Sequence, residues 1–181
     1  GDYSKFRDYI SLAQQPSYFF YKSRPRDIKV LDFGMGWGHY CMASKACGFD
    51  VFGCELSLKR IKFAKLNGIK TIDKPEQIED KFFHYINTDQ VFEHLDNPIN
   101  IIQFFKRIIK DKGIIKISVP NSVSAIKKLK KDNWTPTKNP LHPLEHVNCY
   151  TNKSLINFAK INGFELIFPS KNSENSYQTF F

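Results

Sequence analysis

Short apolar runs alternate along the chain with longer stretches in which apolar residues recur at helical spacing. The apolar runs predict buried strands over residues 28–33, 50–54, 70–72, 83–88 and 113–119. The intervening patterns predict helices over residues 38–47, 57–66 and 98–110, each ended by a change to Gly or polar residues. A further helix over 151–162 precedes a sixth strand at 164–168, and residues 178–181 supply a last strand. Such alternation predicts a Rossmann-like, doubly wound α/β fold with a mostly parallel sheet and helices on both faces.

Two segments lie outside this alternation. Residues 1–27 are mixed and aromatic, which predicts an N-terminal helical cap interrupted near Pro16. Residues 121–150 contain a helix and then a loop rich in proline, which predicts an insertion or lid. The chain is therefore predicted to form one domain over residues 28–181, preceded by the cap. Ligands of such folds bind beyond the carboxyl ends of the strands, here those of the first, second and fourth.

Composition and charge narrow the class of protein. The 181 residues are 41% apolar and 25% charged, which is typical of a globular domain. They include 27 basic and 18 acidic residues, a net charge of +9. The densest basic run, within residues 127–131, lacks the interleaved aromatic residues of an RNA-binding motif. We therefore expect no nucleic-acid partner, although an anionic small molecule fits the charge.

The cysteine pattern and the apolar runs indicate the compartment. The four cysteines contain no C-x-x-C pair, so no zinc knuckle is expected. Three of them fall in segments predicted as core helix or strand, which predicts small reduced thiols there. The longest apolar runs are too short to cross a bilayer, and no secretory leader is visible at the start of the sequence. We expect a cytoplasmic protein without a membrane span.

A glycine-rich loop directly follows the first strand. Gly34, Gly36 and Gly38 stand at alternate positions between this strand and the next helix. Glycine allows positive φ and lets a ligand approach the backbone, and the helix start adds free N–H groups. A dinucleotide-binding loop would have its third glycine at position 39, which is His39, and would not place the acid Asp32 before the loop. An acid there suits a ligand that carries an ammonium group.

Glu55 ends the second strand, 23 residues after Asp32. A carboxylate at this position of a Rossmann-like fold accepts hydrogen bonds from the ribose hydroxyls of an adenosine. The loop and the acid together predict a site for an adenosine-containing ligand.

These segments, taken with three others, resemble a known family. VLDFGMGWG at 30–38 and GFDVFGCELS at 48–57 are similar to the first two motifs of class I S-adenosylmethionine-dependent methyltransferases. The segments DQVFEHLDNP, GIIKISVPN and EHVNCYTNKSLINFAKINGFE, at 89–98, 113–121 and 145–165, resemble later segments of bacterial members that act on small molecules. The resemblance covers residues 28–168.

The resemblance implies S-adenosylmethionine as the cofactor and assigns the residues that bind it. By position, Asp32, Gly34, Gly36 and Gly38 would hold its methionine part, and Glu55 its ribose. Thr88, Asp89 and Gln90, after the fourth strand, would pass close to the methionine part. The acid that contacts adenine in many members has only a loose counterpart in Asp73.

The donor methyl is already activated, so the protein mainly has to align acceptor, methyl and sulfur. A base is needed where the acceptor is a hydroxyl, an ammonium or a C–H acid. His94 and His146 are the predicted catalytic residues, and His142, Glu145 and Tyr150 are further candidates. Glu93, His94 and His146 could also meet around a metal. Related ubiquinone-pathway O-methyltransferases carry an extra Glu where this chain has Gln90, so no metal is expected.

The predicted function is methyl transfer to a small-molecule acceptor such as a sugar or a lipid-linked metabolite. An RNA or protein methyltransferase and a non-catalytic S-adenosylmethionine-binding domain remain as alternatives. The acceptor and the oligomeric state do not follow from the sequence.

Overall fold

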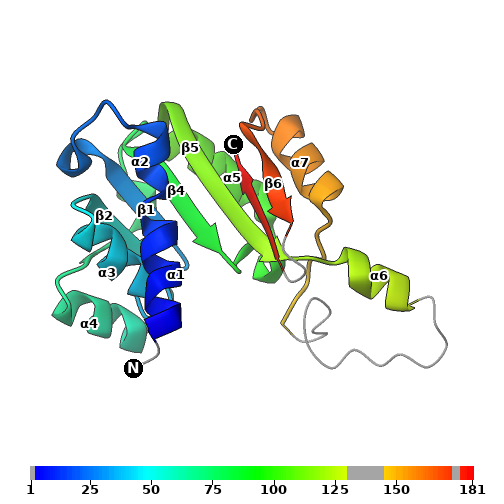
Figure 1. The fold of residues 1–181 in the computed structure, drawn as a ribbon, viewed down its shortest axis with the longest axis horizontal. Helices are drawn as coiled ribbons and strands as arrows, with labels where there is room; N and C mark the ends of the chain where they lie inside the picture. Colours follow the sequence, from blue (N-terminus) through cyan, green and yellow to red (C-terminus); the bar gives the residue numbers. More distant parts are fainter. Residues whose placement is uncertain (1–2, 130–144, 173–175) are drawn as a thin grey trace. The chain divides into compact units, whose positions relative to one another are not determined.

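The structure of the protein is a computed structural model that describes residues 3–129, 145–172 and 176–181 (Figure 1). The described residues form two compact units. The first contains residues up to 87 together with 107–115, and the second contains 88–106 and the residues from 116 onward.

The first unit is built on a parallel sheet. Its strands are β1 (Lys29–Phe33), β2 (Asp50–Cys54), β3 (Lys70–Thr71), most of β4 (Phe83–Asp89) and the first half of β5 (Ile109–Pro120). They lie in the order β3-β2-β1-β4-β5, and β1 pairs in parallel with both β2 and β4. The central strand β1 places Leu31 opposite Phe52 and Ile86. The switch in strand order at β1 leaves the ends of β1, β2 and β4 on one edge, as predicted.

The helices of the first unit are α1 (Tyr3–Ala13), α2 (Gln15–Phe19), α3 (His39–Ala46) and α4 (Leu58–Leu66), with 3₁₀ turns η1 (Pro25–Asp27) and η2 (Pro75–Gln77). Helix α1 packs beside α3, where the rings of Tyr9 and His39 lie 5.5 Å apart (Figure 1). Pro16 lies in the first turn of α2, where a missing N–H costs no helical hydrogen bond. The aromatic N-terminal segment therefore forms two helices, as its sequence predicts.

The second unit contains the second half of β5 and two antiparallel strands. Its other elements are the 3₁₀ turn η3 (Phe92–His94), most of α5 (Pro98–Ile108), α6 (Val123–Leu129), α7 (Asn152–Ile161), β6 (Phe168–Asn172) and β7 (Ser176–Phe180). The strand order is β5-β7-β6, and β7 runs antiparallel to both neighbours. Thr151 caps α7 through reciprocal hydrogen bonds with Ser154. The predicted last strand is therefore confirmed, and α7 begins with a capping box.

Two predicted boundaries are wrong. Helix α5 ends at Ile108 and β5 begins at Ile109, whereas the sequence predicts a helix up to residue 110 and a strand from 113. The backbone N–H of Phe82, next to β4, donates a hydrogen bond to Ile108 O. Pairing in this part of the sheet therefore begins before Gly113. The sixth strand starts at Phe168 instead of residue 164, because residues 164–167 connect α7 to the sheet. Both predictions rested on the pattern of apolar residues, which does not show where strands pair.

Candidate functional site

Asp32 lies inside the first unit at the end of β1. Its side chain is 3% exposed. Its Oδ1 accepts a hydrogen bond of 2.7 Å from the Asn87 amide, and its Oδ2 one of 3.4 Å from the Cys41 thiol. Burial raises the pKa of the Cys41 thiol well above its usual value, and the charge of Asp32 adds to the shift. The structure therefore places a negative charge below the glycine loop and fixes its orientation.

The glycine loop has left-handed backbone at all three predicted positions. The φ angles of Gly34, Gly36 and Gly38 are 79°, 55° and 76°. A Cβ built on Gly36 would meet no atom within 4 Å, whereas one on Gly38 would contact Ala64 at 3.6 Å. Gly38 is also the N-cap of α3. The backbone conformation requires glycine, and the space beside Gly36 is open to a ligand.

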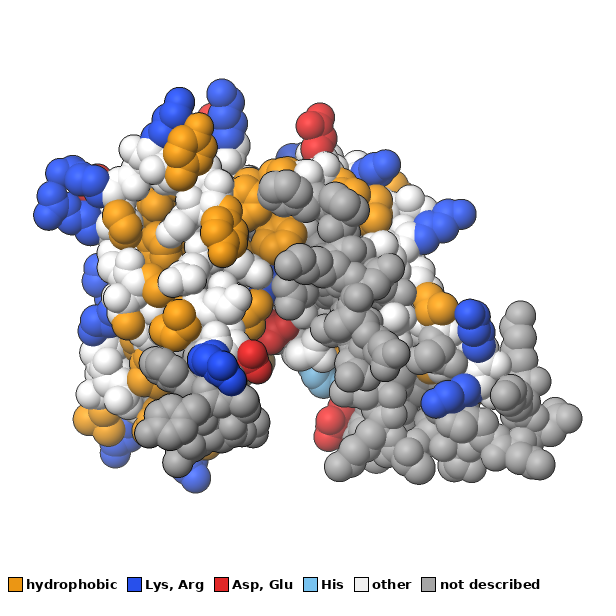
Figure 2. Space-filling view, in the orientation of Figure 1, with side chains coloured by type: hydrophobic (Ala, Val, Ile, Leu, Met, Phe, Trp, Pro, Cys, Tyr) orange, Lys and Arg blue, Asp and Glu red, His pale blue; other side chains and the backbone are white. Residues whose placement is uncertain are grey.

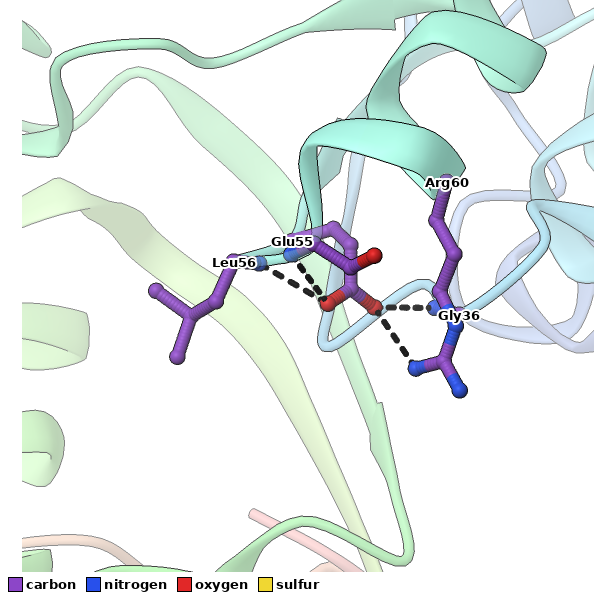
Figure 3. A network of polar contacts seen from close by, with 5 residues as sticks. Gly36, Glu55, Leu56 and Arg60 are labelled. Atoms are coloured by element: carbon purple, nitrogen blue, oxygen red, sulfur yellow. Dashed lines mark hydrogen bonds and ion pairs between the residues drawn. The ribbon is translucent and has the colours of Figure 1, made fainter.

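Glu55 connects the glycine loop to the start of α4 (Figure 3). Its Oε2 accepts a hydrogen bond of 3.0 Å from the Gly36 N–H. Its Oε1 accepts the N–H groups of Leu56 and Ser57, at 2.8 and 3.0 Å. Three backbone donors thus hold the carboxylate at the end of β2, where the sequence predicts a ribose-binding acid.

Arg60 is a residue of this network that the sequence did not reveal. Its Nη1 lies 3.5 Å from Glu55 Oε2 (Figure 3). Its guanidinium carbon lies 6.0 Å from the centre of the Trp37 ring, which also packs edge-on against Phe63. The side chain of Leu56, beside them, is 96% exposed. Arg60 therefore links the carboxylate of Glu55 to the ring of Trp37.

The loop after β3 contains the loose candidate Asp73. A hollow of about 440 Å³ is lined by residues 71–74, Gln77 and Ile78. Asp73 is hydrogen-bonded to Lys65 at 2.9 Å and to Thr71 at 3.2 Å. The Lys65 ammonium lowers the pKa of this carboxyl below its usual value. Asp73 is thus an ion-paired surface acid at the edge of a hollow.

In the second unit, Thr88, Asp89 and Gln90 follow one another at the end of β4. Thr88 is buried, and its hydroxyl has no hydrogen-bond partner among the described residues. Asp89 is exposed. Gln90 has a φ of 56°, and its N–H donates to Ser118 O at 2.8 Å. Left-handed backbone at a residue other than glycine is uncommon and is often found at functional sites.

Glu93, His94 and His146 come together in the second unit, although 52 residues separate His94 from His146 in the sequence. Each offers one ligand atom, and these three atoms lie within 4.8 Å of one another. The two imidazole rings are 4.8 Å apart and nearly perpendicular. His94 Nδ1 lies 2.7 Å from the backbone oxygen of Glu145. The structure therefore brings both predicted catalytic histidines together with Glu93, the juxtaposition considered from the sequence.

Asn148 holds the two segments of this cluster together. Its backbone N–H donates to Glu93 O at 3.0 Å, and its side-chain amide donates to Leu95 O at 2.7 Å. The buried Phe92 anchors the same turn against Phe158 of α7. The local sequence EHVNCYT contains Asn148 but does not show that it bonds to a turn 50 residues earlier.

The carboxyl group of Glu93 is buried in the cluster. The side chain is 1% exposed, and neither oxygen has a hydrogen-bond partner among the described residues. Burial raises its pKa to about 7, against smaller lowering effects of the backbone N–H of Glu93 and of the His94 charge, while the charge of Asp89 adds the least. Burial, together with the charge of Glu93, raises the pKa of Tyr150 to about 12. Perturbed groups of this kind are typical of functional sites.

Two predicted parts of the acceptor side can be assigned only in part. His142 and Trp134 lie outside the described residues. Tyr18 and Tyr21, from the N-terminal segment, are exposed, whereas the ring of Phe19 packs against Tyr85 at 6.2 Å. In the part of the chain that the structure describes, no helix is long and apolar enough to cross a membrane.

Comparison with known proteins places this geometry in a family. A model described as a methyltransferase domain matches residues 3–167. A ubiquinone biosynthesis O-methyltransferase from Actinobacillus pleuropneumoniae is 29% identical over 107 residues, which are 51% of this chain and 46% of that protein. The uncharacterized protein MJ1123 from Methanocaldococcus jannaschii is 29% identical over 143 residues, or 76% of this chain and 64% of that one. The chain spans about half the length of the curated ubiquinone enzymes that it matches.

Solved structures share the fold at low sequence identity. The PH0226 protein from Pyrococcus horikoshii has a TM-score of 0.69 and 22% identity, and the match covers 97% of this chain and 89% of that one. A magnesium protoporphyrin IX methyltransferase from Synechocystis, with bound SAH, also has a TM-score of 0.69, at 13% identity and coverages of 97% and 82%. The predicted Rossmann-like fold class is thereby confirmed.

Proposed function

Since the chain belongs to the methyltransferase domain family, we propose that it transfers a methyl group from S-adenosylmethionine to a small-molecule acceptor. The observation that carries this proposal is the carboxylate of Glu55, held at the end of β2 by backbone N–H groups of the glycine loop and of the residues that lead into α4. A fixed carboxylate beside an open glycine backbone suits an adenosine ligand without a phosphate.

The residues of the first unit fit this cofactor. The space beside Gly36 is open, so a ligand can lie against its backbone. Glu55 would accept the ribose hydroxyls, and the charge of the buried Asp32 would attract the amino group of the methionine part. The hollow beside Asp73, whose lining is mostly polar, is the proposed place for the adenine, and Asp73 is the loose candidate for a contact to its amine.

In the second unit, Thr88, Asp89 and Gln90 are the proposed contacts to the methionine part. The left-handed backbone of Gln90 fixes the path of this loop. The hydroxyl of Thr88 is buried and has no hydrogen-bond partner among the residues that the structure describes, so the proposed contact requires the loop to open toward the ligand.

When bound, the cofactor supplies an activated methyl on a positively charged sulfur. The protein's own contribution is to orient the acceptor and to hold its proton. Where the hydroxyl, ammonium or C–H acid of an acceptor must lose a proton, His94 is the proposed base. Its Nδ1 faces the backbone oxygen of Glu145, so the proton resides there and Nε2 is left as a proton acceptor. His146, whose ring contacts that of His94, would share this role.

A hydroxyl-bearing metabolite is the acceptor class that we favour. The matching curated relatives are named as O-methyltransferases, and they align over about half of their own length. The cap over residues 1–27 and the insertion over 121–150 would shape the acceptor pocket. On the described part of the face in Figure 2, the Lys and Arg side chains stand in several separate groups. An RNA acceptor is disfavoured because the densest basic run of the sequence, within residues 127–131, lacks the interleaved aromatic residues of an RNA-binding motif.

The first test is calorimetric titration with S-adenosylmethionine, S-adenosylhomocysteine and NAD in parallel. We expect micromolar binding of the first two and none of NAD. Binding of NAD alone would overturn the cofactor assignment. Transfer of a labelled methyl to a panel of hydroxylated metabolites then separates an enzyme from a non-catalytic binding domain, in which binding occurs without transfer.

A further inference from the structure

The buried carboxyl group of Glu93 lacks the hydrogen bonds that a buried acid requires. Neither oxygen has a partner among the described residues, and the side chain is 1% exposed. An isolated buried carboxylate costs several kcal/mol, at order of magnitude, and is found in proteins paired with a cation or a donor. A partner for the carboxyl group must therefore lie in the space that this group faces.

That space is bounded by two imidazoles. The ligand atoms of His94 and His146 lie within 4.8 Å of one another and of a Glu93 oxygen, yet the Glu93 oxygens make no hydrogen bond to either ring. A proton relay would place these atoms in hydrogen-bond contact, at about 2.6–3.2 Å. A first-row metal ion with bonds of about 2.0–2.2 Å keeps its ligand atoms farther apart, at roughly 3–4 Å. Three ligand atoms this close together, with no hydrogen bond from the Glu93 oxygens to either ring, therefore favour a shared cation over a relay.

The surroundings orient the histidine as a metal ligand. His94 Nδ1 lies 2.7 Å from the Glu145 backbone oxygen, so this nitrogen carries the proton and Nε2 faces away from the carbonyl. A metal-binding histidine usually donates its other N–H to a carbonyl or carboxylate in this way. Asn148 fixes the spacing, because it bonds to the backbone oxygens of Glu93 and Leu95 from the segment that carries His146.

We propose that Glu93, His94 and His146 form a binding site for a divalent transition-metal ion, with two imidazoles and one carboxylate as ligands. This ligand set does not use position 90, where related ubiquinone-pathway O-methyltransferases carry a Glu and this chain has Gln90. Two imidazoles favour Zn²⁺ or a similar ion over Mg²⁺, which prefers oxygen ligands and keeps its waters.

The cluster is closed on one side and open on the other. Glu93 is buried, His146 is half-buried and His94 is exposed. Three protein ligands with an accessible side leave a coordination position for an outside oxygen, as in catalytic zinc sites. A metal there would bind an acceptor hydroxyl and lower its pKa, and the two histidines would then act as its ligands instead of as the proposed base.

The test measures metal binding without cofactor or acceptor, so its failure would leave the methyl-donor assignment untouched. The full chain, stripped with EDTA and kept reduced, is titrated with Co²⁺ by visible absorption and with Zn²⁺ and Mg²⁺ by calorimetry. We expect one Zn²⁺ per chain, no comparable Mg²⁺ binding, and a Co²⁺ spectrum without a thiolate charge-transfer band.

Glu93→Gln and His146→Ala should each weaken Zn²⁺ binding by more than about 100-fold, because loss of an outer-sphere partner alone costs 10- to 100-fold. His39→Ala, which removes an exposed histidine of the first unit, is the matched control and should bind Zn²⁺ as the parent does. Circular dichroism confirms that each variant is folded. The proposal is overturned if Zn²⁺ fails to bind, if Mg²⁺ binds more tightly, if a thiolate band appears, or if folded Glu93→Gln and His146→Ala bind Zn²⁺ as the parent does.

Discussion

Replacement of Glu55 by Gln tests the cofactor site most directly, because it changes one charge and no volume. In the parent, Oε1 accepts the N–H groups of Leu56 and Ser57, while Oε2 accepts that of Gly36 and faces Arg60 (Figure 3). A glutamine can keep an oxygen toward Leu56 and Ser57 only by turning its NH₂ toward Gly36. Two donors would then face each other across the glycine loop.

The structure sets the size of two separate effects. The unliganded protein loses one hydrogen bond between a backbone N–H and a charged group, which costs about 1.5–3 kcal/mol. The ribose loses its charged acceptor, and a second loss of about 1.5–3 kcal/mol weakens cofactor binding by roughly 10- to 150-fold. Arg60 is about half exposed, so loss of its ion pair at 3.5 Å adds little to either effect.

Calorimetry with S-adenosylhomocysteine gives the second effect, and urea unfolding without ligand gives the first. The matched control is Glu76→Gln, at an exposed acid of η2, which should change neither quantity measurably. An unchanged dissociation constant in folded Glu55→Gln would refute the assignment of Glu55 to the ribose. A loss of affinity equal to that of Glu76→Gln would indicate a general effect of net charge.

Three further substitutions and one labelling experiment probe the rest of the molecule. Gly36→Val should lower the free energy of unfolding in urea by about 1–2 kcal/mol or more, because a φ of 55° at this position disfavours L residues. It should also abolish cofactor binding in calorimetry, although the added side chain causes no packing clash. Asp32→Ala should leave the chain folded but less stable by about 1–3 kcal/mol, from lost hydrogen bonds, and should also abolish binding; retained affinity would exclude its role. His94→Ala should lower turnover by about 10²–10⁴ with cofactor affinity unchanged, if it is the base; equal losses in both would exclude that. Iodoacetamide at neutral pH should modify Cys54 more slowly than the exposed Cys149, as measured by mass spectrometry. Burial raises the pKa of Cys54 to about 11 and so keeps its thiol protonated. Faster labelling of Cys54 than of Cys149 would contradict this burial.

The central strands β1 and β4 could be predicted because each apolar run is buried along most of its length. Val30, Leu31 and Ile86, for example, are all inaccessible to solvent. The errors arise where pairing and apolar pattern differ. Residues 164–167 are apolar enough for a strand, yet the ladder with β7 begins only at Phe168. Periodicity reports burial, whereas a strand boundary depends on a partner elsewhere in the chain.

The same distinction applies to the site. The glycine loop and Glu55 could be predicted because their geometry is local to a strand end and the following turn. Arg60 and Asn148 could not, since each acts through a contact with another segment. Asn148 matters most, because its hydrogen bonds to the turn of Glu93 bring His146 to His94. Spacing in the sequence does not encode that contact.

Two carboxylates of this chain have opposite surroundings, and the contrast bears on what each can bind. Glu55 accepts three backbone N–H groups, so its charge is already stabilised and its orientation fixed before any ligand arrives. Such a group suits neutral hydroxyl donors, which add hydrogen bonds and bring no charge. Glu93 has no donor among the described residues and two imidazoles within 4.8 Å. Its ionised form gains most from a positive charge in that space, because no existing hydrogen bond has to be given up. The difference in donors therefore supports a ribose at Glu55 and a cation at Glu93.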